Sequence, residues 1–405
     1  MSAARGYTRW MPLAVVGCIL VVTLSPMDGP THVAPRMCVP CGEQWMVQDV
    51  LNALLFLPLG LALRRLGASW WLSIAAGCAL STTVEALQWS LVPGRYAALE
   101  DVLANTAGVA LAWAVRWPRP RHRTERRAVS GLAVVTLGLG AWSLAWQQAM
   151  LRPVALVDTV LQVAPSRRGF AGFDGALLGL MVNGQPVVGT TVPTGRAPAA
   201  GASLVTLVAD VRVRSLASRP TSILRLVAGG TSFTYLGLRG RRVELRPMVR
   251  GAVHALRAPT FGLPMALPPQ MSAGGQRAQI IAGVSTETLE IGACLGDASE
   301  PSCRSSRVRP GPAQGWLLWI PLVDDGTLLP RAASGAWLAL PFLPTALAAG
   351  ALGTAAALAG VLACAGAVAA LVAFGHVVPP DPVSALIAIV VVSIVARLGR
   401  RHATG

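Results

Sequence analysis

The chain has 405 residues, of which 53% are hydrophobic and 13% are charged. Soluble domains carry roughly 25% charged residues, about twice that share. The mean hydropathy is +0.56, and the apolar residues form long runs near both ends, with a more polar stretch between them. This pattern excludes a single soluble globule, a disordered chain and a small disulfide-rich scaffold. It predicts a multi-span membrane protein with a sizeable insertion.

The net charge is +16, and every one of the 34 basic side chains is arginine. The densest basic cluster lies directly between two apolar runs, which favours a cytoplasmic anchoring loop over a nucleic-acid surface. No nucleic-acid partner is predicted. The cluster contains Arg116, Arg119, Arg121, Arg123, Arg126 and Arg127.

Five apolar runs in the first 150 residues are long enough, or nearly so, to cross some 30 Å of hydrocarbon. Arg5 and Arg9 precede the first run and predict a cytoplasmic N-terminus. Alternating crossings then place Arg64, Arg65 and the arginine loop inside, and the segment after the fifth run outside. The predicted spans cover about residues 11–24, 47–63, 70–91, 99–115 and 129–150.

The segment 151–335 is richer in Pro, Gly, Ser and Thr and contains short, alternating, β-branched stretches that predict strands. Their spacing predicts an extracytoplasmic all-β sandwich. The stretches are 203–213 (SLVTLVADVRV), 222–227 (SILRLV), 242–246 (RVELR), 278–284 (AQIIAGV) and 316–323 (WLLWIPLV).

Residues 336–374 are apolar for about twice the length of one span, so we expect two helices divided near 350–353. A last span over about 383–395 precedes Arg397, Arg400 and Arg401, which belong in the cytoplasm. The expectation is about eight spans in three parts: a five-helix membrane domain (1–150), the sandwich (151–335) and a three-helix segment (336–405). Seven spans are the main alternative.

The seven cysteines fall into two sets. Cys18, Cys78 and Cys364 lie inside apolar runs, where a thiol usually packs as a small apolar group. The other four face the oxidising side in this topology, where disulfides persist. A disulfide, free thiols, and a metal or redox site all remain open for each of these two pairs, Cys38 with Cys41 and Cys294 with Cys303.

Ionisable groups within a membrane are costly, and an acid and an amide three or four residues apart share one helix face. Three consecutive predicted helices carry such a pair, which predicts packing between the faces, a polar pocket with Arg95 at its rim for an anionic head group, or an ion path. The pairs are Asp49 with Asn52, Glu85 with Gln88, and Asp101 with Asn105.

Buried carboxylates such as Glu85 and Asp101 could in principle perform acid–base work. The sequence contains no nucleophile elbow, zinc-protease motif or glycine-rich phosphate loop, so an enzyme is not favoured, and no cofactor or metal is predicted. His254 and His376 are isolated in the sequence, and we expect loop or interfacial side chains there. The Asp324–Asp325 pair alone offers too few oxygens for calcium.

Three blocks, in order and similarly spaced, resemble the VanZ-like membrane family over about the first 115 residues. They are 52–60 (NALLFLPLG), 81–88 (STTVEALQ) and 101–108 (DVLANTAG), with Arg95 ahead of the third. The family is named after a protein associated with teicoplanin resistance, so the resemblance implies a bacterial cell-envelope role without a settled catalytic mechanism. It implies functional roles for Asn52, Glu85, Gln88, Arg95, Asp101 and Asn105. Simple members end soon after the third block, whereas this chain continues.

Part of the middle segment resembles the laminin-G or concanavalin A-like jelly rolls attached to some VanZ-like proteins. The resemblance rests on 222–227 (SILRLV), 233–238 (FTYLGL) and 243–247 (VELRP), and it implies sugar binding through aromatic platforms. Aromatic residues are sparse here. Trp316 and Trp319 lie in an apolar run that favours packing over a sugar-binding surface.

These observations predict a multi-pass protein of the bacterial cytoplasmic membrane whose partners are lipids, a lipid-linked cell-wall precursor or a glycan. The leading hypothesis is that the polar helix faces hold a lipid-linked or anionic head group. The second is a membrane enzyme acting through Glu85 and Asp101 on a lipid-linked envelope precursor. The third is a structural or assembly protein whose β-domain contacts carbohydrate or a partner protein.

Overall fold

The computed structural model describes most of the chain in two compact units, which are considered separately. The first unit is Met1–Trp117 with His254–Leu256, and the second is Pro118–Val253 with Arg257–Gly405. The described residues are 3–24, 37–38, 44–92, 97–114, 123–154, 159–163, 171–187, 203–228, 231–265, 274–295 and 302–404.

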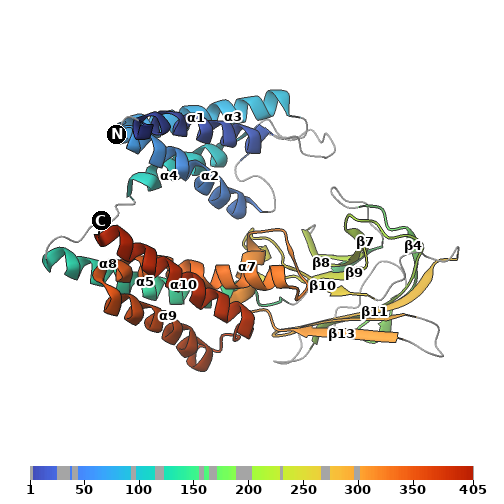
Figure 1. The fold of residues 1–405 in the computed structure, drawn as a ribbon. Helices are drawn as coiled ribbons and strands as arrows, with labels where there is room; N and C mark the ends of the chain where they lie inside the picture. The colour runs from blue at the N-terminus through green and yellow to red at the C-terminus, as the bar shows by residue number, and fades with distance from the viewer. Residues whose placement is uncertain are drawn as a thin grey trace. The chain divides into compact units, whose positions relative to one another are not determined.

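The first unit is a helical bundle with one very short parallel strand pair (Figure 1). A Gly67 φ of +81° reverses the chain after α2, and Ser69 then caps α3 by accepting a hydrogen bond from the Leu72 N–H. The elements are α1 (Ala3–Leu24), β1 (Met37–Cys38), α2 (Trp45–Arg65), α3 (Trp70–Leu91), β2 (Ala97–Ala98) and α4 (Leu99–Ala114).

The second unit joins a helical bundle to two β-sheets, which lie beyond one end of the helices (Figure 1). The fifth helix, which the sequence grouped with the first four, packs here against the C-terminal helices. The bundle contains α5 (Arg123–Met150), α7 (Leu328–Ala339), the 3₁₀ turn η2 (Leu340–Phe342), α8 (Leu343–Leu352), α9 (Thr354–Phe374) and α10 (Pro382–Thr404).

The chain turns between α8 and α9 at Gly353, where the sequence predicted a division. Its φ of +121° is a backbone conformation that glycine alone adopts readily. The last helical run before this turn begins at Leu328, a few residues earlier than the expected boundary at 335.

Within the described residues, five helical segments have the length and composition to cross a membrane, which makes this chain a membrane protein. Large apolar side chains on these segments point outward, as lipid contact requires; Val134, Leu362 and Phe374 are 70%, 62% and 85% exposed. The expected total of eight spans stays a prediction, because α4 has 16 residues and α3 carries several polar ones. The five are Trp45–Arg65, Val129–Met150, Leu328–Leu352, Thr354–Phe374 and Pro382–Arg400.

The β-region consists of two six-stranded sheets that share one hydrophobic core. One sheet has the order β14-β10-β9-β8-β7-β3 and the other β13-β12-β11-β6-β4-β5, and only the β10–β14 pair in them is parallel. The strands of the first sheet are β3 (Thr159–Val163), β7 (Thr221–Ala228), β8 (Thr231–Arg239), β9 (Arg242–Arg246), β10 (Thr260–Pro264) and β14 (Val323–Asp324). Those of the second are β4 (Gly175–Val182), β5 (Gln185–Pro186), β6 (Ser203–Val213), β11 (Gln276–Ser285), β12 (Leu289–Leu295) and β13 (Ser302–Val308).

Strand β6 shows how the sequence pattern produces this core. Every second residue from Val205 to Val213 is at most 5% exposed, as expected when alternate side chains of a strand point to one buried face. Each valine or leucine side chain among them stabilises the fold by about 1.5–3 kcal/mol through its removal from water. The segment 203–213 is a strand over its full predicted length, and the finer jelly-roll topology stays a prediction.

The predicted strand at 316–323 is wrong over most of its length. Its first three residues belong to η1 (Pro312–Leu318), a 3₁₀ helix that begins at Pro312. The Gln314 side chain caps the N-terminal end of η1 by accepting from the Gly311 N–H at 2.9 Å. Trp316 fills the sandwich core and donates from Nε1 to Ser334 Oγ at 3.1 Å. An apolar run without alternation does not distinguish a strand from a short buried helix.

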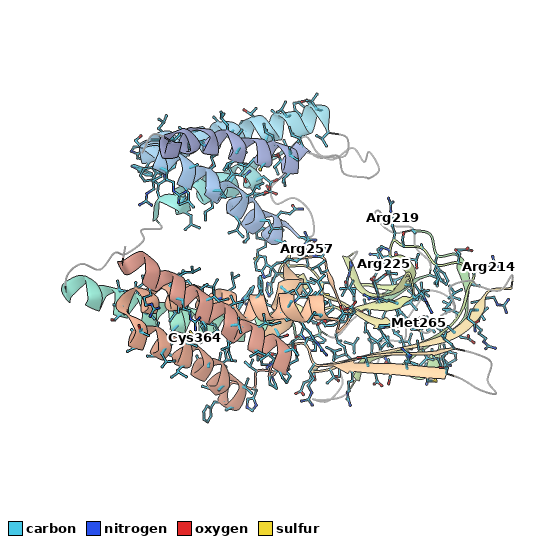
Figure 2. The ribbon with its side chains drawn as sticks, viewed as in Figure 1. Arg214, Arg219, Arg225, Arg257, Met265 and Cys364 are labelled. Atoms are coloured by element: carbon cyan, nitrogen blue, oxygen red, sulfur yellow. A yellow bond between two sulfur atoms is a disulfide. The ribbon has the colours of Figure 1, made fainter. Side chains whose placement is uncertain are left out.

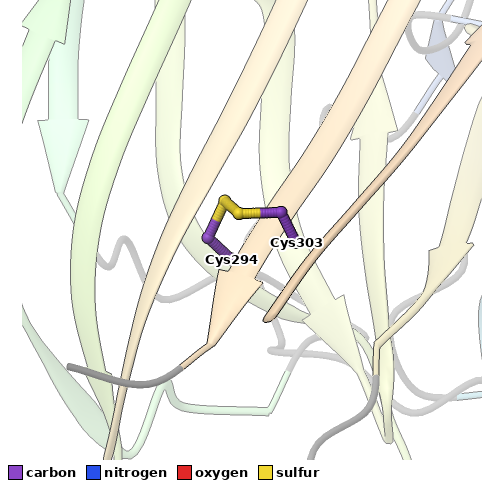
Figure 3. The surroundings of a disulfide bond; sticks show 2 residues. All are labelled: Cys294 and Cys303. Carbon is purple, nitrogen blue, oxygen red and sulfur yellow. A yellow bond between two sulfur atoms is a disulfide. The ribbon is translucent and has the colours of Figure 1, made fainter. Parts of the chain in front are cut away.

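A disulfide joins Cys294 on β12 to Cys303 on β13, at positions that face each other across the two antiparallel strands (Figure 3). The cysteines at 18, 78 and 364 are free, and Cys364 is buried. The other proposed pair lies outside what the structure describes, because Cys41 and the side chain of Cys38 are among the residues left out.

A buried carboxylate lies in the first sheet. The Glu244 side chain is 1% exposed, and its Oε1 lies 2.8 Å from Arg239 Nε. Burial raises the pKa of Glu244 above its usual range, against the opposing effect of Arg239 and Arg246. The folded state therefore holds a proton more tightly than the unfolded chain does.

This linkage predicts that part of the sandwich's stability is present below about pH 4.5 and is lost as pH rises through the raised pKa of Glu244. Glu244→Gln should remove that part of the slope, which is at most about 1.4 kcal/mol per pH unit. Thermal unfolding of the detergent-purified chain at a series of pH values measures it. Glu290→Gln, on the exposed part of β12, is the control and should leave the slope unchanged. An identical slope in both variants would contradict the assignment.

Candidate functional site: the polar end of the N-terminal unit

Helices α2 and α4 run in the same direction and touch through glycine. A side chain at Gly108 would overlap the carbonyl oxygen of Ala53, and one at Gly60 would lie 2.6 Å from the Ala112 Cβ. Nearer the other end of the pair, Arg64 donates to the Ala112 carbonyl at 3.2 Å. These contacts fix which residues of the two helices lie at the same level.

Helix α3 packs against α4 in the opposite direction. Gly77 faces Val109, and one turn further Asn105 Nδ2 donates to Ser81 Oγ at 2.8 Å. The next step of four residues along each helix sets Glu85 level with Asp101. In agreement, the Ala98 N–H just before α4 donates to Glu85 Oε2 at 2.9 Å.

Asp49 and Asn105 lie near each other in this register, because Asp49 comes one turn before Ala53 and Asn105 three residues before Gly108. Asn105 is 2% exposed. Oδ1 of Asp49 and Oδ1 of Asn105 are both buried, and neither accepts a hydrogen bond from any residue that the structure describes. A buried acceptor without a donor costs about 1–3 kcal/mol.

The remaining predicted residues are also at this end of the unit, where the structure describes them. Gln88 is 4% exposed and its Nε2 donates to the Thr23 carbonyl of α1 at 2.8 Å. Asn52 and Asp101 are half-buried on α2 and α4. Arg95, expected at the rim, lies outside the described residues.

Sequence reasoning missed the partners of these side chains. Ser81 accepts from Asn105, and the backbone of Thr23 and of Ala98 satisfies Gln88 and Glu85. Ser81 had one local signal: it is a small polar residue one turn before Glu85, on the same helix face. The two backbone groups carry no signal in the sequence.

The arrangement is a set of hydrogen-bonding groups at one end of a helical bundle. Three of the amide and acid side chains tie helices or segments together, while Oδ1 of Asp49 and Oδ1 of Asn105 accept no hydrogen bond from a described residue. Among the described residues no group of His, Cys, Asp and Glu side chains has the composition and spacing of a metal site. The oxygens of Asp49 and Asn105 can accept hydrogen bonds from a donor group.

The fold and the site together define a helical membrane protein with a polar bundle end and a separate β-sandwich. Comparison with known proteins gives the family of its first part: residues 13–117 match the VanZ/LLP1 family model, which confirms the VanZ-like resemblance. The match covers the second half of α1 and all of α2, α3 and α4, and it does not reach the sandwich. No curated protein and no solved structure matches this chain.

The contact between Gly108 and Ala53 predicts a strong effect of Gly108→Val. The added side chain must push α4 away from α2, and overpacking of this kind costs about 1–3 kcal/mol or more. We expect a clear loss of monodisperse protein in fluorescence-detected size-exclusion chromatography. Gly131→Val is the matched control, since nothing lies within 4 Å of a side chain there. Equal yields of the two variants would show that α2 and α4 do not pack as described.

Proposed function

We propose that this chain is a cell-envelope membrane protein whose N-terminal polar end binds the head group of a lipid-linked ligand. The ligand presents hydroxyl, amide or ammonium donors to Asp49 and Asn105, in keeping with a lipid-linked cell-wall precursor. The observation that carries the proposal is the pair of buried acceptors, one on each of two helices held level by Gly108.

The location of these acceptors supports a ligand rather than a defect of packing. At the same bundle end, the Gln88 and Glu85 side chains and Asn105 Nδ2 each have a hydrogen-bond partner, as most buried polar groups in proteins do. The Glu100 carboxylate also acts electrostatically on Asp49. An acidic, acceptor-rich spot of this kind suits donors better than the anionic group that the sequence alone suggested.

The VanZ/LLP1 match supports an envelope role for this binding, with a link to teicoplanin resistance through the family resemblance. Lipid-linked precursors of the cell wall carry sugar hydroxyls and peptide amides, which are donors suited to these two acceptors. A protein that held such a head group at the membrane surface would change its exposure to a glycopeptide antibiotic.

Asp49→Ala tests the proposal, because no residue that the structure describes donates a hydrogen bond to Asp49 Oδ1. The variant should bind a lipid-linked peptidoglycan precursor, supplied in mixed micelles, at least about tenfold more weakly, a change of about 1.4 kcal/mol. Its melting temperature should stay level or rise, since a buried unsatisfied acceptor and its repulsion by Glu100 are removed. Gln48→Ala, the exposed neighbour on α2, should alter neither quantity. Unchanged affinity in Asp49→Ala would refute the proposal.

A membrane enzyme acting through Glu85 and Asp101 is the second candidate, and the register that sets these carboxylates level favours it. Glu85→Gln separates the two ideas. Glutamine keeps an oxygen acceptor for the Ala98 N–H, so we expect normal abundance and an unchanged teicoplanin susceptibility of cells that produce the variant. Loss of the wild-type effect at normal abundance would establish the enzyme instead. A drop in abundance shared with Glu85→Leu would point to a structural role.

A further inference from the structure

A cavity of about 850 Å³ lies in the second unit, where the sandwich meets the helices. Its wall comes from the end of α5, the β11–β12 turn, the segment after β13 and the connection between α9 and α10. Ligand pockets commonly measure about 300–1,000 Å³. The cavity is independent of the N-terminal polar end.

The lining is strongly cationic. Arg152, Arg250 and Arg309 contribute three guanidinium groups, beside the imidazole of His376 and a single carboxylate, Glu287. All five side chains are exposed. In the part of the chain that the structure describes, none of the three arginine side chains forms a hydrogen bond or an ion pair. Guanidinium groups bind phosphate oxygens in a bidentate, charge-assisted manner.

The position of the charges matches the surface of a membrane. Arg152 follows the last residue of α5 by two positions, and His376 follows the last residue of α9 by two. Both helices are membrane-span candidates, so their shared end marks the level of the lipid head groups. Phe374, two residues before His376, is 85% exposed and offers an apolar contact for an acyl chain.

The walls are held in place by hydrogen bonds. Gln148, 8% exposed at the end of α5, donates to the Pro310 carbonyl at 3.1 Å and accepts from the Val378 N–H at 3.2 Å. The Arg250 N–H donates to the Arg152 carbonyl at 3.0 Å, which sets two of the arginines side by side. Preorganised walls of this kind lower the cost of binding.

His376 also has a left-handed backbone, with a φ of +51°. A left-handed backbone raises the conformational free energy of a non-glycine residue, and such strain concentrates at functional sites. Here it brings the imidazole to the wall that also carries the arginines.

We propose that this cavity binds the phosphate of an anionic phospholipid head group from the adjoining leaflet. The phosphate pairs with Arg152, Arg250 and Arg309, and the acyl chains lie along the exposed apolar faces of α5 and α9. The sandwich is thereby tied to the membrane surface independently of the covalent connections to the helices.

The test uses the full-length chain in neutral detergent, titrated with phosphatidylglycerol or phosphatidylcholine in mixed micelles and, separately, with inorganic phosphate. Native mass spectrometry and thermal shift report binding. We expect phosphatidylglycerol to bind more tightly than phosphatidylcholine. The triple change R152A, R250A, R309A should weaken it at least about tenfold, and Glu287→Gln should strengthen it severalfold by removing the one negative charge in the wall.

The control removes the same number of charges elsewhere on the sandwich, with R214A, R241A and R304A, all exposed and outside the cavity. Figure 2 shows Arg214 at the end of the sandwich remote from the helices (Figure 2). An equal loss in this control, or equal affinity for the two lipids, would overturn the proposal, and so would inorganic phosphate binding as tightly as phosphatidylglycerol. If the triple variant melts well below wild type without lipid, single Arg250→Ala and Arg309→Ala carry the test, and unchanged affinity in both overturns it.

Discussion

The N-terminal unit depends on the close approach of α4 to α2, which is possible because position 108 has no side chain. That contact sets the level of the two parallel helices, and the Asn105–Ser81 hydrogen bond sets the level of α3 against them. The polar residues of three helices are thereby brought to one end of the bundle. If the axes of α2 and α4 were further apart, Asp49 and Asn105 would each face lipid or water as separate groups.

A small number of polar side-chain contacts also holds the second unit together. Gln147 and Gln148 follow each other at the end of α5 and point to different neighbours: Gln147 Oε1 accepts from Trp337 Nε1 at 2.8 Å, while Gln148 bridges Pro310 and Val378. The side-chain amides of Gln147 and Gln148 thus attach α5 to α7, to the segment after β13 and to the α9–α10 connection. A junction built from fully satisfied side chains is rigid as well as specific.

Much of this architecture could be predicted from local pattern. The alternation in 203–213, the apolar lengths of five of the spans and the break at Gly353 are properties of neighbouring residues, and the structure follows them. The prediction of a strand at 316–323 was wrong because an apolar run without periodicity does not distinguish a strand from a helix. The partners of Glu85 and Gln88 could not be found, since they are backbone groups 13 and 65 residues away. The partner of Asn105, Ser81, is 24 residues away, and only its place on the face of Glu85 pointed to it. Likewise, the cationic cavity gathers arginines from three separate segments of the chain. His376 is expected from the sequence to be a loop or interfacial side chain, and it lies in the connection between α9 and α10.

Strand β13 forms an edge of its sheet, and most of its residues are exposed. An open edge presents unpaired backbone groups that can template pairing with another chain. The covalent link from Cys303 to Cys294 fastens this border to the strand beside it. Under reducing conditions, only the backbone hydrogen bonds to β12 would hold β13 in the sheet. The propensity of this molecule to self-associate into sheets therefore depends on the redox state of the compartment in which the sandwich folds.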